Sequence, residues 1–280
     1  NKVAVIGAGL MGAGIAYEQA RAGIETILVD VSVENAEKGK DYSRKLVEKN
    51  VSRGKMTKEK GDALLALIKP TANYDDFKGA DLVVEAVFEN PELKAKITQM
   101  AEAQLSDTAV MGSNTSTLPI TGLAEASVRP ANFIGIHFFS PVERMGLVEI
   151  ISGKETSEET LAKAIDYVLK IRKTPIVVND SRGFYTYTQE GLEMLGEGIK
   201  PAIIENVGRQ SGMPMGPLEV SDSVGLDTAL KVGRQMAQAM GVDYTNDARG
   251  QMMAWLVEDQ GRVGRKAGKG FYDYNEKGKP

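Results

Sequence analysis

The chain has 280 residues, a formal net charge of −4 and 42% hydrophobic residues, a size that fits one large domain or two ordinary ones and excludes a disordered chain. It contains no Cys and a single His, which excludes disulfides, cysteine nucleophiles and thiolate or histidine metal clusters, so we expect no metal site. The acidic balance argues against nucleic acid as a partner.

Neither a membrane span nor a leader is visible in the sequence. No run approaches the roughly 20 apolar residues that a membrane-spanning helix requires. The chain starts at Asn1-Lys2-Val3, without a charged and then apolar segment, so we expect a cytoplasmic location. The end, Asn275–Pro280, resembles the start of a linker, and we expect a piece of a longer chain.

Short apolar runs alternate with helical stretches up to residue 180. The pattern predicts strands at 3–6, 26–30, 81–87, 109–111, 133–137, 147–151 and 175–178, separated by helices that include 10–22, 91–104 and 157–170. Such alternation predicts an α/β fold with a Rossmann-type, parallel, doubly wound sheet. Residues 189–259 show helical spacing and no strand. We therefore predict two domains, 1–182 with the sheet and 183–280 all-α.

A glycine motif follows the first predicted strand. In Gly7-Ala8-Gly9-Leu10-Met11-Gly12 the glycines permit a tight turn, approach of the backbone to a pyrophosphate, and close packing of helix on strand. Asp30 ends the next strand, where a carboxylate binds a ribose 2′-hydroxyl and repels a 2′-phosphate. The motif predicts NAD rather than NADP as the cofactor; the alternative is a glycine-rich turn that binds nothing.

A basic segment follows the second strand. Between Lys38 and Lys60 there are nine basic and three acidic residues, in an inserted helical pair at about residues 33–67. A basic surface next to a dinucleotide site could hold the nucleotide end of coenzyme A. A solvated helix face explains the composition equally well.

One polar residue interrupts each of two later apolar strands. His137 and Glu149 would face each other if the loop 140–145 turned the chain back. The carboxylate would then fix the imidazole tautomer and make His137 a general base. A purely structural His–Glu hydrogen bond is the alternative.

Several motifs taken in order resemble the L-3-hydroxyacyl-CoA dehydrogenase family. They are Gly7–Gly12, Glu85–Asn90, Ser113–Ser116, His137–Val142 and Leu147–Ile150, with Met215–Leu218, Val224–Asp227 and Gly264–Tyr272 in the all-α half. The likeness covers nearly the whole chain and is greatest to the dehydrogenase part of multifunctional fatty-acid β-oxidation proteins. It implies NAD-dependent oxidation of (S)-3-hydroxyacyl-CoA to 3-oxoacyl-CoA.

The resemblance also implies roles for single residues. His137 matches the catalytic base, Glu149 its partner, and Ser116 a catalytic residue that contacts both substrate and nicotinamide. Ser43 matches a second substrate contact, on coenzyme A. The cofactor contacts that it implies are Gly7, Gly9, Leu10, Met11, Gly12, Asp30, Glu89, Lys94, Ser116, Ser140 and Lys266. The family usually has Asn at the position of Ser140.

The segment Gly183–Glu190 departs from the family pattern. It is shorter by about six residues and lacks the Asn or Ser that touches the thioester end of the substrate. The explanations are a true deletion or a disordered stretch that the printed sequence omits, and we favour the second. A true loss would shift the following helix by more than one turn of about 3.6 residues.

Two other functions compete with this interpretation. A 6-phosphogluconate or 3-hydroxyisobutyrate-type dehydrogenase also joins a Rossmann half to an all-α half but typically uses a catalytic Lys. An NAD-binding structural or regulatory protein would use the scaffold without turnover. The expected partners are an acyl-CoA thioester and either a second copy of the chain or another domain of a longer multifunctional chain. Nucleic acid and a membrane span are not expected.

Overall fold

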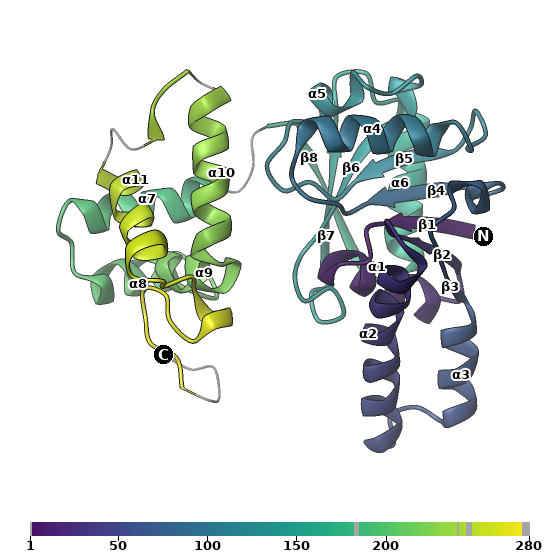
Figure 1. Cartoon of the computed structure of the whole chain (residues 1–280), viewed down its shortest axis with the longest axis horizontal. Coiled ribbons are helices and arrows are strands. Elements are labelled where there is room, and N and C mark those ends of the chain that lie inside the picture. The colour runs from purple at the N-terminus through teal and green to yellow at the C-terminus, as the bar shows by residue number, and fades with distance from the viewer. Residues whose placement is uncertain (1, 182–184, 240, 245–247, 276–280) are drawn as a thin grey trace. The chain divides into compact units, whose positions relative to one another are not determined.

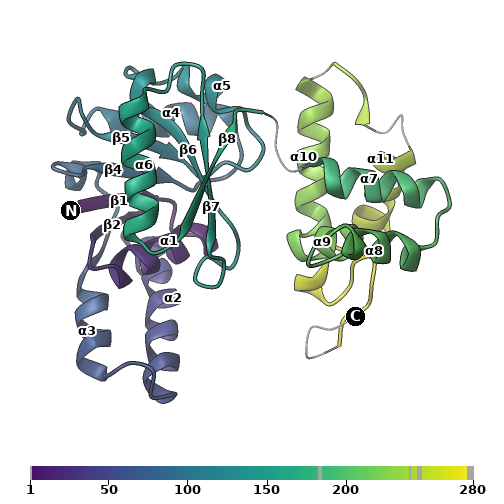
Figure 2. The same ribbon diagram turned by 180° about the vertical axis from the view of Figure 1, so that it is seen from behind.

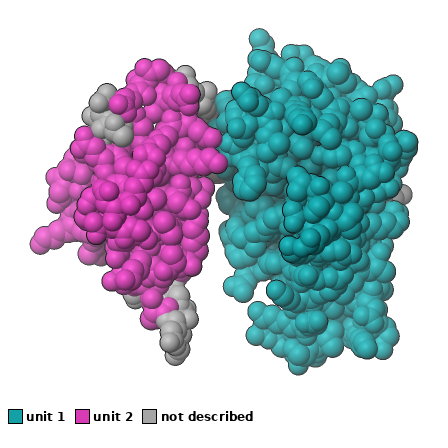
Figure 3. Space-filling view, viewed as in Figure 1, with its two compact units in different colours: residues 1–182 teal, residues 183–280 magenta. Residues whose placement is uncertain are grey.

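The computed structural model describes residues 2–181, 185–239, 241–244 and 248–275. It divides into two compact units, residues 1–182 and 183–280 (Figure 3). Among the described residues no helix is both long enough and apolar enough to cross a membrane.

Unit 1 is built on one eight-stranded sheet with the strand order β3-β2-β1-β4-β5-β6-β7-β8. The strands are β1 (Lys2–Ile6), β2 (Glu25–Val29), β3 (Ile68–Thr71), β4 (Leu82–Glu85), β5 (Val110–Ser113), β6 (Phe133–Phe138), β7 (Leu147–Ser152) and β8 (Thr174–Asn179). Neighbouring strands from β1 to β6 are parallel, β7 is antiparallel to β6, and β8 is parallel to β7.

The predicted parallel sheet is therefore wrong for β7 and β8, which run against the other strands. Residues 139–146 connect β6 to β7. A parallel crossover needs a dozen or more residues, so this short connection forces an antiparallel pair. Strand β3 was not predicted at all, because its sequence Ile-Lys-Pro-Thr contains a single large apolar residue and a Pro.

Helices cover both faces of the sheet (Figure 1 and Figure 2). One face carries α1 (Leu10–Arg21), α2 (Val33–Ser52), α3 (Lys58–Ala66) and α6 (Glu158–Lys170), and the other carries α4 (Pro91–Glu102), α5 (Ile120–Ala124) and the short helix η1 (Tyr74–Phe77). In β1, Val3 and Val5 pack in the hydrophobic core under α1, α2, α3 and α6, whereas Ala4 and Ile6 pack in the core on the opposite face, under α4, α5 and η1. This alternation is what a strand buried on both faces requires.

The inserted segment contains the hairpin of α2 and α3, which projects beyond the sheet (Figure 1). Helix α2 begins at a Ser32 cap, whose hydroxyl accepts the backbone N–H of Asn35. Helix α3 begins in the same way, at Thr57. Such caps satisfy backbone donors that the first helical turn leaves unpaired.

The elements of unit 2 among the described residues are helices and short helical turns. It contains α7 (Tyr185–Gly196), α8 (Pro201–Gln210), α9 (Pro217–Val224), α10 (Leu226–Ala239) and α11 (Ala248–Ala254), followed by a π-helical turn at Trp255–Asp259 and a 3₁₀ turn at Arg265–Ala267. A sheet domain followed by a helical one confirms the predicted fold class. The shortened segment lies partly at residues 183–184, outside the described residues.

Candidate active site

The sheet brings distant parts of the sequence to one edge of unit 1. Gly7 follows β1 and Asp30 follows β2, while Glu85 ends β4 and Ser113 ends β5. His137 is the penultimate residue of β6. Because these strands are parallel, their carboxyl ends meet at one edge, which is where ligands bind in open α/β sheets.

The glycine turn has the geometry that a dinucleotide requires. Gly7 has φ +95°, a conformation that other residues rarely adopt. A Cβ on Gly12 would lie 1.7 Å from the carbonyl oxygen of Gly7, so the helix and the turn are in direct backbone contact. A Cβ on Gly9 would meet nothing within 4 Å. Gly9 is also the cap of α1 and supplies no side-chain hydrogen bond, so the first N–H groups of α1 suit a pyrophosphate.

Asp30 connects this turn to the neighbouring strand. Its Oδ2 accepts the backbone N–H of Ala8 at 2.7 Å, and its Oδ1 accepts the backbone N–H of Val31 at 2.8 Å. The side-chain amide of Asn35 donates to Oδ1 at 3.3 Å. Since a carboxylate has about four acceptor positions, it can still accept a ribose hydroxyl. The residues of this corner therefore fit NAD.

A buried ion pair lies between β4 and the start of α4. Lys94 is 2% exposed, and its Nζ lies 2.7 Å and 2.9 Å from the two carboxylate oxygens of Glu85 and 3.2 Å from Glu89 Oε2. Glu85 also accepts the hydroxyl of Ser113 and the backbone N–H of Val87, both at 2.7 Å. Lys94 is thus a buried partner of two carboxylates and not a solvated helical lysine.

Glu89 organises the loop that carries Ser116. Its Oε1 accepts the Thr115 hydroxyl at 2.6 Å, the Ser116 backbone N–H at 2.9 Å, and both the backbone N–H and the hydroxyl of Thr117. Burial raises the pKa of Glu89, but the attraction of Lys94 and these hydrogen bonds outweigh burial and hold the pKa below its usual range. Glu89 is therefore an anion that fixes the backbone around Ser116.

His137 and Glu149 are paired directly across β6 and β7. Nδ1 of His137 lies 3.1 Å from Oε2 of Glu149, and the two residues are 7% and 9% exposed. A carboxylate only accepts hydrogen bonds, so a neutral imidazole in this pair has its proton on Nδ1 and its basic nitrogen at Nε2. Phe139 packs edge-on against the ring at 4.8 Å.

The pair points to the face of the sheet that α5 covers. A Cβ on Gly135, two residues before His137, would lie 2.8 Å from the side chain of Ile120 in α5. Residues two apart in a strand share a face. The loop of Ser116 leads into α5, and the side chain of Asn114 in that loop accepts the backbone N–H of Phe138 at 2.8 Å. The Ser116 loop is thus fastened to the strand of His137.

The remaining predicted contacts lie in different surroundings. Met11 is half-buried in the first turn of α1, whereas Leu10 and Ser140 are exposed. Ser43 lies on the inner side of α2, 1% exposed, with a buried hydroxyl that has no partner among the described residues; the structure does not place it at a surface. Lys266 belongs to unit 2, where its Nζ lies 2.7 Å from Asp227.

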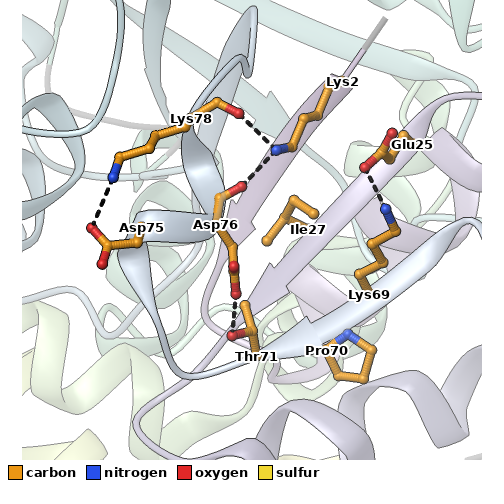
Figure 4. Close-up of a pocket in the computed structure, with 9 residues that line it drawn as sticks. All are labelled: Lys2, Glu25, Ile27, Lys69, Pro70, Thr71, Asp75, Asp76 and Lys78. Atoms are coloured by element: carbon orange, nitrogen blue, oxygen red, sulfur yellow. Dashed lines mark hydrogen bonds and ion pairs between the residues drawn. The ribbon is translucent and has the colours of Figure 1, made fainter.

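A separate cavity of about 370 Å³ lies beside the starts of β1 and β2 (Figure 4). Its lysines already have partners within the protein. Lys69 lies 2.7 Å from Glu25, Lys78 lies 3.6 Å from Asp75, and Lys2 donates to two backbone carbonyl oxygens. The fingerprint glycines and His137 are not among its lining residues. This cavity is therefore not the candidate active site.

Sequence reasoning missed the partners that hold the site together. Glu85, Ser113 and Asn114 were part of the family motifs but received no role. A charged residue at the end of an otherwise apolar strand, as Glu85 is in Leu-Val-Val-Glu, is the signal that could have identified the partner of Lys94, because a buried charge needs a counter-charge.

Comparisons with known proteins identify the family to which both units belong. Residues 2–181 match the NAD-binding domain of 3-hydroxyacyl-CoA dehydrogenase, and residues 179–274 match its C-terminal domain. The fatty acid oxidation complex subunit alpha of Psychrobacter arcticus is 42% identical over 100% of this chain, which spans 40% of the length of that relative.

Solved structures give the same result over full-length relatives. The (S)-3-hydroxybutyryl-CoA dehydrogenase PaaH1 of Ralstonia eutropha has a TM-score of 0.85 and 34% identity, covering 98% of this chain and 99% of that one. FadB2 of M. tuberculosis has a TM-score of 0.85 and 31% identity, with 98% of each chain covered. The chain belongs to the 3-hydroxyacyl-CoA dehydrogenase family, whose cofactor is NAD.

Proposed function

We propose that this chain oxidises (S)-3-hydroxyacyl-CoA to 3-oxoacyl-CoA with NAD, and that His137 is the general base. The observation that carries the proposal is the His137–Glu149 pair, 3.1 Å apart, at the sheet edge where the glycine turn and Asp30 also lie. Family membership supplies the substrate class. When bound, NAD supplies the hydride acceptor.

His137 takes the proton of the 3-hydroxyl group at Nε2, because Glu149 keeps the proton of the neutral ring on Nδ1. Glu149 then stabilises the imidazolium that forms. Ser116 orients the hydroxyl group, and Glu89 holds the Ser116 backbone in place through an N–H bond of 2.9 Å. Gly7, Gly9, Gly12 and Asp30 hold the dinucleotide. The buried lysines Lys94 and Lys173 bind carboxylates and carbonyls, which favours His137 over a Lys as base.

The two units have separate roles in this proposal. Unit 1 binds NAD, and unit 2 supplies the remaining substrate contacts and a surface for a second copy or for another domain. The relatives that are longer than this chain support a place within a multifunctional β-oxidation protein. The cytoplasmic location expected from the sequence stays a prediction.

The hairpin of α2 and α3 is proposed to hold the nucleotide end of coenzyme A. Arg44 is paired with Glu37 and Asp41, and Lys38 with Glu34. Six further basic side chains of the segment are exposed and form no ion pair with any described residue: Lys45, Lys49, Arg53, Lys55, Lys58 and Lys60. Cations without a partner in the protein can neutralise the phosphates of a ligand.

The test is the formation of NADH or NADPH during oxidation of (S)- and (R)-3-hydroxybutyryl-CoA, with NAD or NADP as the cofactor. The proposal expects turnover with the S isomer and NAD and little with the other combinations. NAD binding without turnover of either isomer would instead identify a binding protein on this scaffold.

A further inference from the structure

The loop that joins His137 to Glu149 is held by one buried ammonium group. Residues 139–146 connect β6 to β7. The Nζ of Lys173 donates to the carbonyl oxygens of Val142 and Met145, both at 2.7 Å. The neighbouring backbone N–H of Thr174 donates to the carbonyl of Gly146, also at 2.7 Å. Three hydrogen bonds from one turn therefore restrain this loop.

Lys173 comes from a turn that directs it inward. It lies between α6 and β8, directly after Arg172, which has the left-handed φ of +61°. Lys173 is 6% exposed. It also forms an ion pair with Glu18 of α1, whose Oε2 lies 3.6 Å from its Nζ. The ammonium group thus donates hydrogen bonds to two carbonyls and forms an ion pair with one carboxylate.

Glu18 connects this cluster to the dinucleotide helix. It is fully buried, and its Oε2 also accepts a hydrogen bond from Arg21 at 2.6 Å. Gly14 lies four residues before Glu18 and so shares its face of α1. A Cβ on Gly14 would lie 2.8 Å from Val142, so the loop packs against α1 without an intervening side chain.

Burial and charge pairing act in opposite directions on this cluster. Burial lowers the pKa of Lys173 and raises the pKa of Glu18. The attraction of Glu18 opposes the shift of the Lys173 pKa, and the attraction of Arg21 and Lys173 opposes the shift of the Glu18 pKa.

A second restraint on the loop between β6 and β7 comes from α2, where the hydroxyl of Tyr42 donates to Glu143 of the loop at 2.8 Å.

The conformation of this loop decides whether His137 meets Glu149. In a hairpin the connection sets the register, and a slip by one residue turns every side chain to the other face. A slip of β7 would therefore carry Glu149 away from the imidazole. We propose that Lys173 is a positioning residue, which fixes the loop between β6 and β7 and thereby the geometry of the His137–Glu149 pair. The inference rests on the proposed function only for its effect on catalysis.

The test uses two variants and a matched control in the full chain. Lys173→Met removes the three donors at similar length. The double variant Glu18→Gln/Lys173→Met removes both buried charges. Arg21, the other partner of Glu18, has a side chain that is 44% exposed, so no unpaired buried charge is left to unfold the protein. Lys163→Met is the control, because Lys163 also donates to a loop carbonyl, that of Thr108 at 2.9 Å, but lies on the exposed side of α6.

Two readouts separate positioning from simple stability. Steady-state kinetics should show kcat reduced about ten- to hundred-fold with the KM for NAD nearly unchanged, because a small displacement of reacting groups costs about that much. The second readout is the imidazole NMR spectrum of tag-free protein. The chain has one His, so a single set of ring signals reports the His137–Glu149 pair whether or not the protein turns over substrate.

The expected result is a shifted or split imidazole signal and a lower kcat in both Lys173 variants, with the parental signal and rate in Lys163→Met. A folded double variant with the parental imidazole signal would overturn the proposal. Failure of the double variant to fold would also overturn it, since Lys173 would then be required for the fold as a whole. If the imidazole signals of the Lys173 variants differ from that of the parent as expected, but the parent oxidises no 3-hydroxyacyl-CoA, the proposed function fails and the positioning role stands.

Discussion

Replacing Lys94 by Met is the most demanding test of how the cofactor edge is held together. The substitution keeps the length of the side chain and removes its charge. It leaves the buried Glu85, which is 1% exposed, and the half-buried Glu89 without their shared cation. The four hydrogen bonds that Glu89 Oε1 accepts around Ser116 then depend on a carboxylate that Glu85 repels.

The size of the effect follows from this geometry. Removing one partner of a buried ion pair costs about 3–5 kcal/mol, because the other charge stays buried and uncompensated. In a unit of this size each kcal/mol lowers the melting temperature by about 2–4 °C, so the loss corresponds to roughly 6–20 °C. The double variant Lys94→Met/Glu85→Gln should recover part of it, since it removes one of the two orphaned charges.

Urea denaturation measures the loss, with Lys96→Met as the matched control. Lys96 lies on the same helix, α4, but is exposed, so its replacement should change the free energy of unfolding by less than about 0.5 kcal/mol. Because the pKa of Glu89 is lowered in the folded parent, its charge stabilises the parent above the ordinary carboxyl range. That stabilisation is lost as the pH falls through the folded pKa.

The difference in unfolding free energy between Lys94→Met and the parent should therefore narrow as the pH falls below the ordinary carboxyl range, toward the lowered pKa of Glu89. A loss below about 1 kcal/mol at neutral pH, or a difference that widens on acidification, would refute the reasoning. Either result would mean that the carboxylates do not depend on Lys94 for their charge.

Three further predictions concern ligand binding. Gly9→Ala should leave thermal stability nearly unchanged, because its Cβ meets nothing within 4 Å, yet weaken NAD binding in a fluorescence titration. Gly12→Ala should lower both thermal stability and NAD affinity, since its Cβ would overlap the Gly7 carbonyl. Equal effects of the two substitutions would contradict the assigned roles. Asp30→Ala should weaken NAD binding and reduce the preference of the enzyme for NAD over NADP. A parent that uses both cofactors equally would show that Asp30 does not select between them. Reversing four charges on the hairpin of α2 and α3, including its connecting turn, should raise the KM for acyl-CoA and leave the KM for NAD unchanged. The effect should disappear at high salt, and an unchanged KM for acyl-CoA would show that the hairpin is a solvated surface. The four substitutions are Lys45→Glu, Lys49→Glu, Lys55→Glu and Lys58→Glu, and the control reverses the exposed residues Lys96, Lys154, Lys200 and Lys231.

Local patterns were sufficient to predict the fold class. The strand, glycine turn and helix at residues 3–22 were readable because a buried parallel strand is a continuous apolar run and the turn needs glycine. The structure has these elements at Lys2–Ile6 and Leu10–Arg21. Strand β3 could not be read, because Lys69 and Pro70 give it neither an apolar run nor a strict alternation.

The sequence predicted one pair of facing site residues but not the tertiary contacts that surround the site. The facing of His137 and Glu149 follows from one hairpin, and the structure pairs them in register. The burial of Ser43 and the shared carboxylates of Lys94 depend on how helices pack on the sheet. The contact of Lys173 with the carbonyls of Val142 and Met145 depends likewise on tertiary packing. No spacing within a helix or a strand encodes contacts of that kind.

The central claim is that His137 is the base that removes the hydroxyl proton. The most direct measurement is single-turnover oxidation of (S)-3-hydroxybutyryl-CoA by the parent and by His137→Gln, with NAD affinity measured on the same samples. The account predicts a rate lower by about two to four powers of ten and nearly parental NAD affinity, because the glycine turn and Asp30 are untouched. A His137→Gln variant that turns over at nearly the parental rate would contradict it.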